Sequence, residues 1–545
     1  MPSATARIAS ASPSRARRAV AAGAAAAFAL GAGMVANEVL GASPAAAAVN
    51  AGADFDGDGF GDVVIPVVGE RVGGQDNAGA LHVVYGTARG LVPRPSQLWS
   101  QASPIWDAAE AGDKFGAAWS AGDFDNDGFD DLAVGVPGEN SNAGAVNVLY
   151  GSVDGITNAN NRLFWQNTPG VPGDAEPLDG FGYALAAGDF DNDGFDDLAV
   201  GAPLDASLAA GGARGGSVTI LYGTAAGLSV TGSAVITQDT AGVPDVAELA
   251  DLFGSALAAG DVDQDGFDDL AVGTKWESSI VAKHGTVTML YGSATGLSGA
   301  RSREIRQGLD GVPGRRDADD NFGAALAIGR FDGGVYPDLV VGVPREDIAT
   351  TSDAGATVAI PGGPSGLRPA RSSLIHAATP GVESRLQSGA QFGAVLAAAD
   401  FDGDGRDDLA VGVWRYSLAL THINAGAIVT LPGGTVMLDG TDPSRLIHQD
   451  RAGMVDEAED FDWFGQYLAP VDANGDGRAE LFVGVPGEDI GTIEDAGAGH
   501  VLGADGSGLL PVSSVLWSQD TPGIGDAAEA FDLFGGAGQE LLPPS

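Results

Sequence analysis

The sequence contains no cysteine among its 545 residues. This absence excludes disulfides, zinc sites with thiolate ligands, cysteine nucleophiles and cysteine-linked lipid anchors. Exported proteins often depend on disulfides for their stability. If this protein is exported, we therefore expect a bound metal ion to take over that stabilising role.

Basic residues are also scarce: 27 Lys and Arg stand against 73 Asp and Glu, which gives a formal net charge of −46. Proteins that bind nucleic acid present basic surfaces, and binding to anionic membrane surfaces depends on basic clusters as well. The composition therefore argues against both kinds of partner.

Long apolar runs are missing after residue 48, so we expect no membrane span there. Before it, four arginines among the first 18 residues precede an apolar, Ala-rich stretch (19–36), and the Ala triplet at 46–48 offers an A-x-A cleavage site. This order is typical of a signal peptide, residues 1–48, and predicts a secreted, extracellular protein after cleavage near Ala48. A disordered tail or a membrane anchor is the alternative interpretation.

The sequence does contain an acidic loop that recurs seven times, 66–72 residues apart. It reads Asp-x-Asp-x-Asp-Gly-x-x-Asp and is followed at once by an apolar run of strand type. A sixth copy, from Asp472, carries Asn474 and Glu480 as substitutes, and a further copy, from Arg330, is degenerate. The complete copies start at Asp54, Asp123, Asp189, Asp261 and Asp400. A sevenfold repeat that spans nearly the whole chain favours a single repeat array over separate modules.

Each repeat has the order of parts expected of one propeller blade. A strand of small residues begins with Phe-Gly (115–118), and the acidic loop and a second strand (131–135) follow it. A Gly-rich connection leads to a third strand (145–151), and a turn leads to a fourth (163–166). Four short strands separated by turn signals describe a blade. The 3.6-residue periodicity of helical repeats is absent.

The ends of the chain predict how the ring closes. The first repeat has a loop but no Phe-Gly strand, and the last Phe-Gly, at Phe534, has no loop after it. We therefore expect the C-terminal strand to complete the N-terminal blade, which removes a free sheet edge. The predicted fold is all-β, a seven-bladed β-propeller closed by the C-terminal strand. Its predicted blades are 49–114 with 534–545, 115–180, 181–252, 253–321, 322–391, 392–463 and 464–533.

The acidic loops predict calcium sites. Carboxylates at positions 1, 3 and 5 can converge in a tight loop, Gly at position 6 permits the turn, position 7 adds a backbone carbonyl, and position 9 can bind through both carboxylate oxygens. Calcium prefers six to eight such oxygens, and magnesium a stricter geometry. An acidic turn without metal is the alternative. The predicted ligands are Asp54, Asp56, Asp58, Phe60, Asp62, Asp123, Asp125, Asp127, Phe129, Asp131, Asp189, Asp191, Asp193, Phe195, Asp197, Asp261, Asp263, Asp265, Phe267, Asp269, Asp400, Asp402, Asp404, Arg406, Asp408, Asp472, Asn474, Asp476, Arg478 and Glu480.

The two imperfect loops predict different occupancies. The loop from Asp472 loses one charge and should bind more weakly. The loop from Arg330 loses two carboxylates and gains a fixed cation, so we predict that it holds no metal and that Arg330 pairs with Asp332 or Asp338. The expected total is about six calcium ions per chain.

The Phe-Gly pairs, the acidic loops and the Gly-x-Pro that ends several second strands (135–137, 342–344, 484–486) resemble the FG-GAP repeat. That repeat builds the seven-bladed propeller at the N-terminus of integrin α-subunits and of many secreted bacterial proteins. The resemblance covers residues 49–545. It implies calcium in the loop between the first two strands of each blade. It also implies adhesion or ligand binding at the opposite face, with an extracellular protein or glycan as the unknown partner. We expect a monomer.

The opposite face should carry the connections between blades, because antiparallel strands place alternate loops at opposite ends. These connections are acidic too, and we hypothesise a negative mouth that attracts cationic groups or further dications. Solubility is the plainer explanation. Trp276 and Trp414 interrupt the Gly-x-Pro position and are candidates for a local binding surface. The acidic residues concerned are Asp107, Glu110, Asp113, Asp245, Glu248, Asp251, Asp456, Glu457, Glu459, Asp460, Asp462, Asp526, Glu529 and Asp532.

Enzyme motifs are not recognisable in the sequence. Gly-x-Ser-x-Gly and His-Glu-x-x-His are absent, and the six histidines are scattered. Propellers can still assemble a site from several blades around the channel. A lyase or hydrolase acting on extracellular polysaccharide, a lectin, and a purely structural surface protein therefore remain alternatives to an adhesion or recognition module.

Overall fold

The computed structural model describes residues 52–92, 95–206, 214–278, 282–418, 422–435, 437–438 and 443–537. The chain separates into two compact units, 1–39 and 40–545, and every described residue belongs to the second. The predicted signal peptide (1–48) and the end of the predicted closing strand (538–545) lie outside the described residues. Within the described ranges, no helix has the length and apolar character needed to cross a bilayer.

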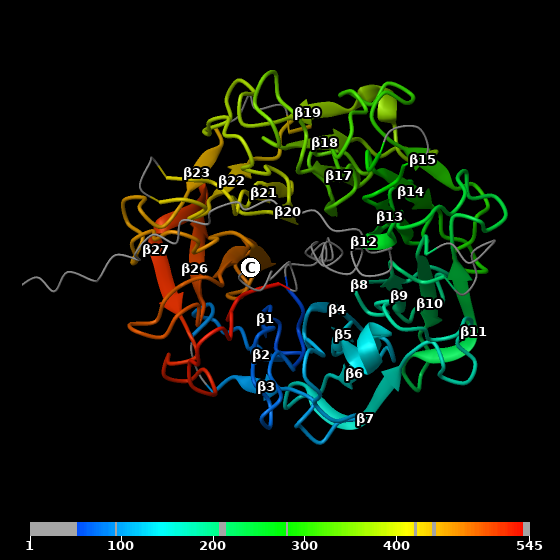
Figure 1. Ribbon diagram of the computed structural model, residues 1–545, viewed down its shortest axis with the longest axis horizontal. Helices are drawn as coiled ribbons and strands as arrows, with labels where there is room; N and C mark the ends of the chain where they lie inside the picture. The colour runs from blue at the N-terminus through cyan, green and yellow to red at the C-terminus, as the bar shows by residue number, and fades with distance from the viewer. Residues whose placement is uncertain are drawn as a thin grey trace, which may run out of the picture. The chain divides into compact units, whose positions relative to one another are not determined.

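The described residues form seven antiparallel sheets, each with four strands except the first, which has three. Figure 1 shows these sheets following one another around a common centre, so the predicted all-β, seven-bladed propeller is confirmed. Within the described ranges, two short helical turns interrupt the strands, α1 (Glu139–Asn142) and η1 (Pro369–Arg371). Blade by blade, the strands are β1 (Val63–Val67), β2 (Ala80–Val84) and β3 (Gln97–Trp99); β4 (Ala118–Gly122), β5 (Asp131–Val136), β6 (Ala145–Tyr150) and β7 (Thr157–Phe164); β8 (Ala184–Gly188), β9 (Asp197–Ala202), β10 (Ser217–Tyr222) and β11 (Ser229–Ile236); β12 (Phe253–Gly260), β13 (Asp269–Thr274), β14 (Thr286–Leu290) and β15 (Arg303–Ile305); β16 (Leu326–Gly329), β17 (Asp338–Val343), β18 (Ala356–Ile360) and β19 (Ser373–Ile375); β20 (Val395–Ala399), β21 (Asp408–Gly412), β22 (Ile428–Leu431) and β23 (Arg445–Ile447); β24 (Tyr467–Val471), β25 (Glu480–Val485), β26 (Ala498–Asp505) and β27 (Gly508–Trp517).

Strand composition follows position within the blade. The second strand β5, Asp-Leu-Ala-Val-Gly-Val, is buried along its whole length, because its sheet packs against a neighbour on each face. The outer strand β7 is mostly polar and partly exposed. Innermost strands such as β8, Ala-Leu-Ala-Ala-Gly, are built mostly from small residues because the blades crowd together there, whereas β24 contains Tyr467 and Pro470. A Cβ added to Gly122 would lie 3.0 Å from the Cβ of Ala187 in the next blade.

The Phe-Gly pairs join each blade to the one before it. All seven Phe side chains are fully buried. Phe181, for example, bridges Gly144 at the start of the third strand in the preceding blade, and its N–H donates to Ala143 O at 2.9 Å. The Phe-Gly signal therefore marks the joint between blades as well as the start of one.

The ring closes through the C-terminal segment. Phe534 bridges Gly497 in the last blade and Val67 of β1 in the first, and Gly535 N donates to Pro66 O at 2.9 Å. The Phe534 ring is buried against residues of both blades, among them Phe482. The predicted pairing of the C-terminal segment with the N-terminal blade is therefore observed.

Candidate metal centres

Each acidic loop is the turn of the hairpin between the first and second strands of a blade. In the second blade, Gly122 pairs with Asp131, so positions 1 to 8 form the turn and position 9 begins the second strand. The position-2 side chain, Phe124, is fully buried and anchors the loop to the core. The acidic side chains are consequently fixed at one end of the blade.

Backbone amides fold the loop around its own carboxylates. Asp123 accepts hydrogen bonds from Asp127 N and Gly128 N, both at 3.0 Å. The N–H of position 7, Phe129, donates to Asp127 at 3.2 Å. The same bonds to positions 1 and 5 recur in the loops from Asp54, Asp189, Asp261 and Asp472.

In the described part of the chain, at least three loops bring carboxylate oxygens within 4.8 Å of one another. These groups are Asp54, Asp56 and Asp58; Asp123, Asp125 and Asp127; and Asp189, Asp191 and Asp197. The convergence predicted for positions 1, 3 and 5 is thus present in the first two. The third group shows that position 9 also reaches the cluster.

The position-3 carboxylates supply the observation that fits a metal ion. In the described part of the chain, Oδ1 of Asp125 and Oδ1 of Asp191 are buried and have no hydrogen-bond partner. Burial, together with the negative charges of Asp127 and Asp123, raises the pKa of Asp125. An unpaired buried carboxylate oxygen is unfavourable, and an all-oxygen donor set suits a hard divalent cation.

Position 9 also has a structural role that the loop pattern did not reveal. Asp131 accepts hydrogen bonds from Phe124 N at 3.1 Å and from Gly151 N at 2.9 Å, and so ties the acidic loop to the turn after the third strand. Burial nevertheless raises the pKa of Asp131 to about 8. Each carboxylate oxygen retains a second lone pair for a cation.

In three of the other acidic loops, an arginine forms an ion pair with a predicted metal ligand. Arg301 pairs with Asp263 at 2.6 Å and with Asp265 at 3.3 Å. Arg406 pairs with Asp404, and Arg478 pairs with Asp476 at 3.1 Å. The loops from Asp261, Asp400 and Asp472 therefore carry a guanidinium at position 5. The position-7 arginines were a visible signal for this pairing, whereas Arg301 was not.

The loop from Asp472 is altered further by its two substitutes. Asn474 Nδ2 donates to Glu480 Oε1 at 2.6 Å, so these predicted ligands bind each other. Burial raises the pKa of Glu480 to about 7.

The predicted partner of Arg330 is wrong. Among the described residues, its guanidinium forms no ion pair with Asp332 or Asp338. Asp338 already accepts hydrogen bonds from Phe331 N at 3.1 Å and Gly362 N at 3.0 Å. Arg330 instead acts on Asp407 in the next blade: burial raises the pKa of Asp407, and the hydrogen bond from Arg330 N at 2.7 Å and the Arg330 charge partly oppose that rise.

A further acidic position, missed in the loop pattern, connects the loops around the ring. At four of the seven loops, position 8 is an Asp whose carboxylate accepts a hydrogen bond from the position-1 N–H of the preceding blade. Asp130 accepts from Asp54 N at 2.8 Å and Asp196 from Asp123 N at 3.0 Å. Asp130 and Asp196 also line a central cavity of about 270 Å³. The Asp-Asp doublets were the signal for this position.

The negative mouth predicted for the opposite face stays a hypothesis, since ten of its fourteen acidic residues are exposed or half-buried. The Asp two residues before Phe-Gly, in contrast, is buried at six blade boundaries, as Asp113, Asp179, Asp251, Asp320, Asp462 and Asp532. These carboxylates therefore lie between blades rather than around an open mouth. Trp414, expected at a binding surface, is buried as well.

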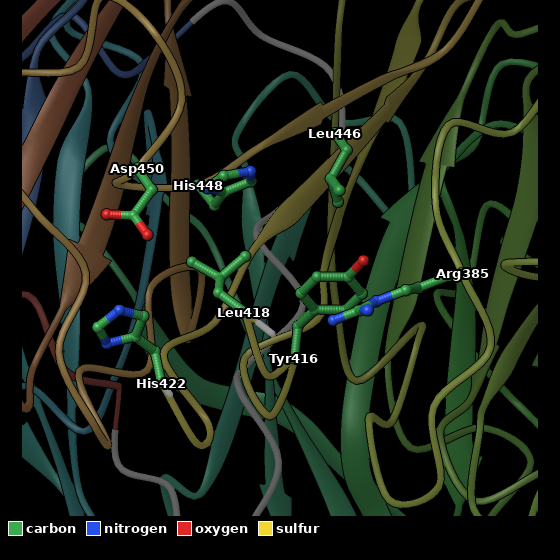
Figure 2. A pocket seen from close by; sticks show the side chains of 7 residues that line it. All are labelled: Arg385, Tyr416, Leu418, His422, Leu446, His448 and Asp450. Atoms are coloured by element: carbon green, nitrogen blue, oxygen red, sulfur yellow. The ribbon is translucent and has the colours of Figure 1, made fainter. Parts of the chain in front are cut away.

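A pocket of about 320 Å³ lies at the sixth blade, on this opposite side of the strands. Figure 2 shows Arg385 beside the ring of Tyr416, and the guanidinium carbon lies 5.5 Å from the ring centre. The pocket combines an aromatic ring with imidazole, guanidinium and carboxylate groups. Its lining residues are Arg385, Tyr416, Leu418, His422, Leu446, His448 and Asp450.

Comparison with known proteins identifies the repeat. Residues 115–149, 181–221, 253–288, 392–420 and 464–502 match the family model described as FG-GAP repeat. Phosphatidylinositol-glycan-specific phospholipase D of Rattus norvegicus is 33% identical over 179 residues, which is 32% of this chain and 20% of that protein. Integrin alpha-PS2 of Drosophila melanogaster is 32% identical over 238 residues, which is 43% of this chain and 15% of that protein. The chain thus matches a small part of the length of either relative.

Among solved structures, the exotype rhamnogalacturonan lyase YesX shares 12% identity with a TM-score of 0.37, over 82% of this chain and 73% of that one. This likeness is too weak to support an argument about function.

Proposed function

The chain carries FG-GAP repeats that form a seven-bladed β-propeller, and from this premise we propose that it is a secreted calcium-binding module for extracellular adhesion or ligand recognition. The observation that carries the calcium proposal is the convergence of carboxylates in the acidic loops, with buried and unpartnered oxygens on Asp125 and Asp191. The similarity to integrin alpha-PS2 supports the adhesion part.

The proposal of export rests on the predicted signal peptide, 1–48. N-terminal sequencing of the secreted protein should give a sequence that begins at Val49.

The loops would hold the ions to different degrees. Within the described ranges no arginine pairs with the loops from Asp123 and Asp189, and these loops should bind calcium most tightly. Loops from Asp261, Asp400 and Asp472 should bind more weakly, since each holds a guanidinium at position 5. The loop from Arg330 should stay empty.

Calcium titration of the metal-free protein by calorimetry tests this order. We expect about six loop sites in all, with those of the Asp123 and Asp189 loops tighter than those of the Asp261, Asp400 and Asp472 loops. A variant with Asp332→Asn in the Arg330 loop is the matched control and should titrate like the wild type. If Asp332→Asn bound one calcium ion fewer than the wild type, the Arg330 loop would hold an ion, and our expectation that it is empty would be wrong. If the wild type bound no calcium at all, the calcium proposal would be overturned.

The recognition proposal needs a ligand, and the pocket beside Tyr416 suggests where a glycan could bind, because it joins an aromatic ring to several polar groups. A glycan array with calcium and with chelator tests this, with Tyr416→Ala and His448→Ala as pocket variants. Retention of an unchanged glycan supports recognition. Turnover of the glycan would instead indicate the polysaccharide-active enzyme, and binding only to proteins would exclude the lectin.

A further inference from the structure

A second set of acidic residues lies at the blade boundaries, at the ends of the strands opposite the acidic loops. At the boundary of the third and fourth blades, four residues meet: Gln238 from the end of one blade, Glu248 and Asp251 before Phe-Gly, and Glu277 after β13. We call such a set a boundary quartet. Its three carboxylates bring oxygens within 4.8 Å of one another. The same grouping recurs in the quartet of the first two blades, through Glu110, Asp113 and Glu139.

Three of the four residues of this quartet are buried, and Glu248 is half-buried. Gln238 is 1% exposed, and Asp251 and Glu277 are 0% exposed. Gln238 Nε2 donates to Glu277 Oε2 at 2.7 Å, and Glu248 N donates to Asp251 Oδ2 at 2.6 Å. These bonds hold residues of two blades in one cluster.

Three oxygens of this quartet are left over. Oδ1 of Asp251, Oε2 of Glu248 and Oε1 of Gln238 are buried, and none has a hydrogen-bond partner within the described ranges. Neither Glu248 nor Asp251 forms an ion pair with any described Lys or Arg. Leaving several buried acceptors unsatisfied in one place is unfavourable unless a cation is shared among them. The amide oxygen adds a neutral ligand of the type that hard cations accept.

Two other boundaries of the same ring support a cation here. At the boundary of the second and third blades, Arg214 Nη1 lies 3.5 Å from Oδ1 of Asp179, the equivalent of Asp251. The chain itself therefore places a positive charge against this carboxylate.

At the boundary of the fifth and sixth blades, the whole quartet is replaced. Ala377, Gln387, Ala390 and Tyr416 stand at the four positions. Figure 2 shows the Tyr416 ring here with Arg385 beside it. The four residues are lost together, as expected if they serve one bound group.

We propose that the boundary quartets are a second class of divalent-cation site, which joins neighbouring blades on the face opposite the acidic loops. The ion is a hard cation such as calcium, held by two or three carboxylates, the glutamine amide oxygen and water. This site class does not depend on metal in the acidic loops.

Anomalous diffraction from crystals of the unmodified chain grown with MnCl2 tests the proposal without any variant. We expect a manganese peak between Glu248, Asp251 and Glu277. Peaks in the acidic loops but none in any quartet would overturn this inference alone. Absence of peaks from both would overturn it together with the proposed metal loops.

Calcium counting by equilibrium dialysis provides the second readout. The double variant Glu248→Gln with Asp251→Asn should bind about one calcium ion fewer per chain than the wild type. Gln387→Ala, at the boundary that lacks a quartet, is the matched control and should bind as many ions as the wild type. An unchanged count in the double variant would show that the quartet is held by shared protons and hydrogen bonds.

Discussion

At the scale of the residue, the position-3 aspartate separates metal binding from loop folding. Positions 1 and 9 accept several backbone hydrogen bonds, so their removal would damage the loop with or without metal. Asp125 Oδ1 has no partner in the described part of the chain. The Asp125 carboxylate also receives a hydrogen bond from Asp127 N, which an Asn side-chain oxygen can accept as well, so Asp125→Asn removes few protein contacts.

We expect Asp125→Asn to weaken calcium binding in its loop about tenfold, which lowers the free energy of unfolding in saturating calcium by about 1.4 kcal/mol. In metal-free buffer the change should be neutral or slightly stabilising, since it removes a buried charge near Asp123 and Asp127. Chemical denaturation in both buffers measures the difference. Equal destabilisation in the two buffers would contradict a ligand role for Asp125.

Arg301 competes with calcium for the loop from Asp261, because it pairs with both Asp263 and Asp265. Arg301 is half exposed, so the competition is modest. Arg301→Ala should tighten calcium binding there by up to about fivefold, or about 1 kcal/mol. Arg345→Ala, whose ion pair with Asp353 lies away from the acidic loops, is the control. Calorimetric titration measures the change. Weaker calcium binding by Arg301→Ala would contradict the proposed competition between Arg301 and calcium.

Contacts between residues close in the sequence could be predicted, and contacts between distant residues could not. Positions 1, 3 and 5 share one tight turn, so their convergence follows from spacing alone. Arg301 reaches Asp265 across 36 residues, and the pairing depends on how the blade folds. The partner of Arg330 was missed for a similar reason, because the carboxylate it acts on, Asp407, belongs to the next blade.

At the scale of the element, the hairpin that carries each loop buries its position-9 carboxylate. Burial raises the pKa of Asp131, Asp197 and Asp269 to about 8 in each case. In an unfolded chain the pKa of Asp is about 3.9. Without metal, the folded state therefore binds these protons more tightly than the unfolded state does.

The sign of the pH dependence follows from that difference. The stabilising contribution is complete below about pH 4 and is lost as pH rises through about 8. We expect the melting temperature of metal-free protein to fall between pH 5 and pH 9. In excess calcium the fall should be smaller or reversed, because the ion replaces the protons. A metal-free protein that becomes more stable over this range would contradict the account.

The order of the strands could be predicted because every blade repeats local signals: Phe-Gly, loop and apolar second strand. The bounds of the first and fourth strands were predicted less well, since β4 is Ala118–Gly122 rather than 115–118 and β7 is Thr157–Phe164 rather than 163–166. The links between blades were only partly predicted. The position-8 carboxylate accepts from a loop that lies 73 residues earlier in one case, and nothing in a single repeat shows that contact. The residues of a boundary quartet come from three separate segments of the chain. The sequence therefore revealed only the acidic connections between blades, and the grouping itself was not predicted.

At the scale of the whole molecule, closure depends on Phe534, which contacts the first and last blades. Removal of residues 534–545 should lower the free energy of unfolding by more than the roughly 3–5 kcal/mol expected for loss of one buried Phe, because a sheet edge is exposed as well. Removal of 538–545 alone keeps Phe534 and should cost far less. Equal stability of the two truncated chains, measured by chemical denaturation, would contradict closure through Phe534.

The net charge of −46 makes the molecule sensitive to its counterions. Six filled loops would offset about 12 of these charges. The remaining acidic groups would keep the protein away from nucleic acid and anionic membranes. Bound cations in the loops, and at the boundary quartets, would reduce repulsion where carboxylates lie closest together.

The central claim is that the clustered loop carboxylates are stable together because divalent ions lie among them. The most direct test is the melting temperature of the purified chain in millimolar calcium and in EGTA, with bound calcium counted in the same samples. We predict a higher melting temperature in calcium, with several ions bound per chain. Identical melting temperatures and no bound ion would contradict the claim.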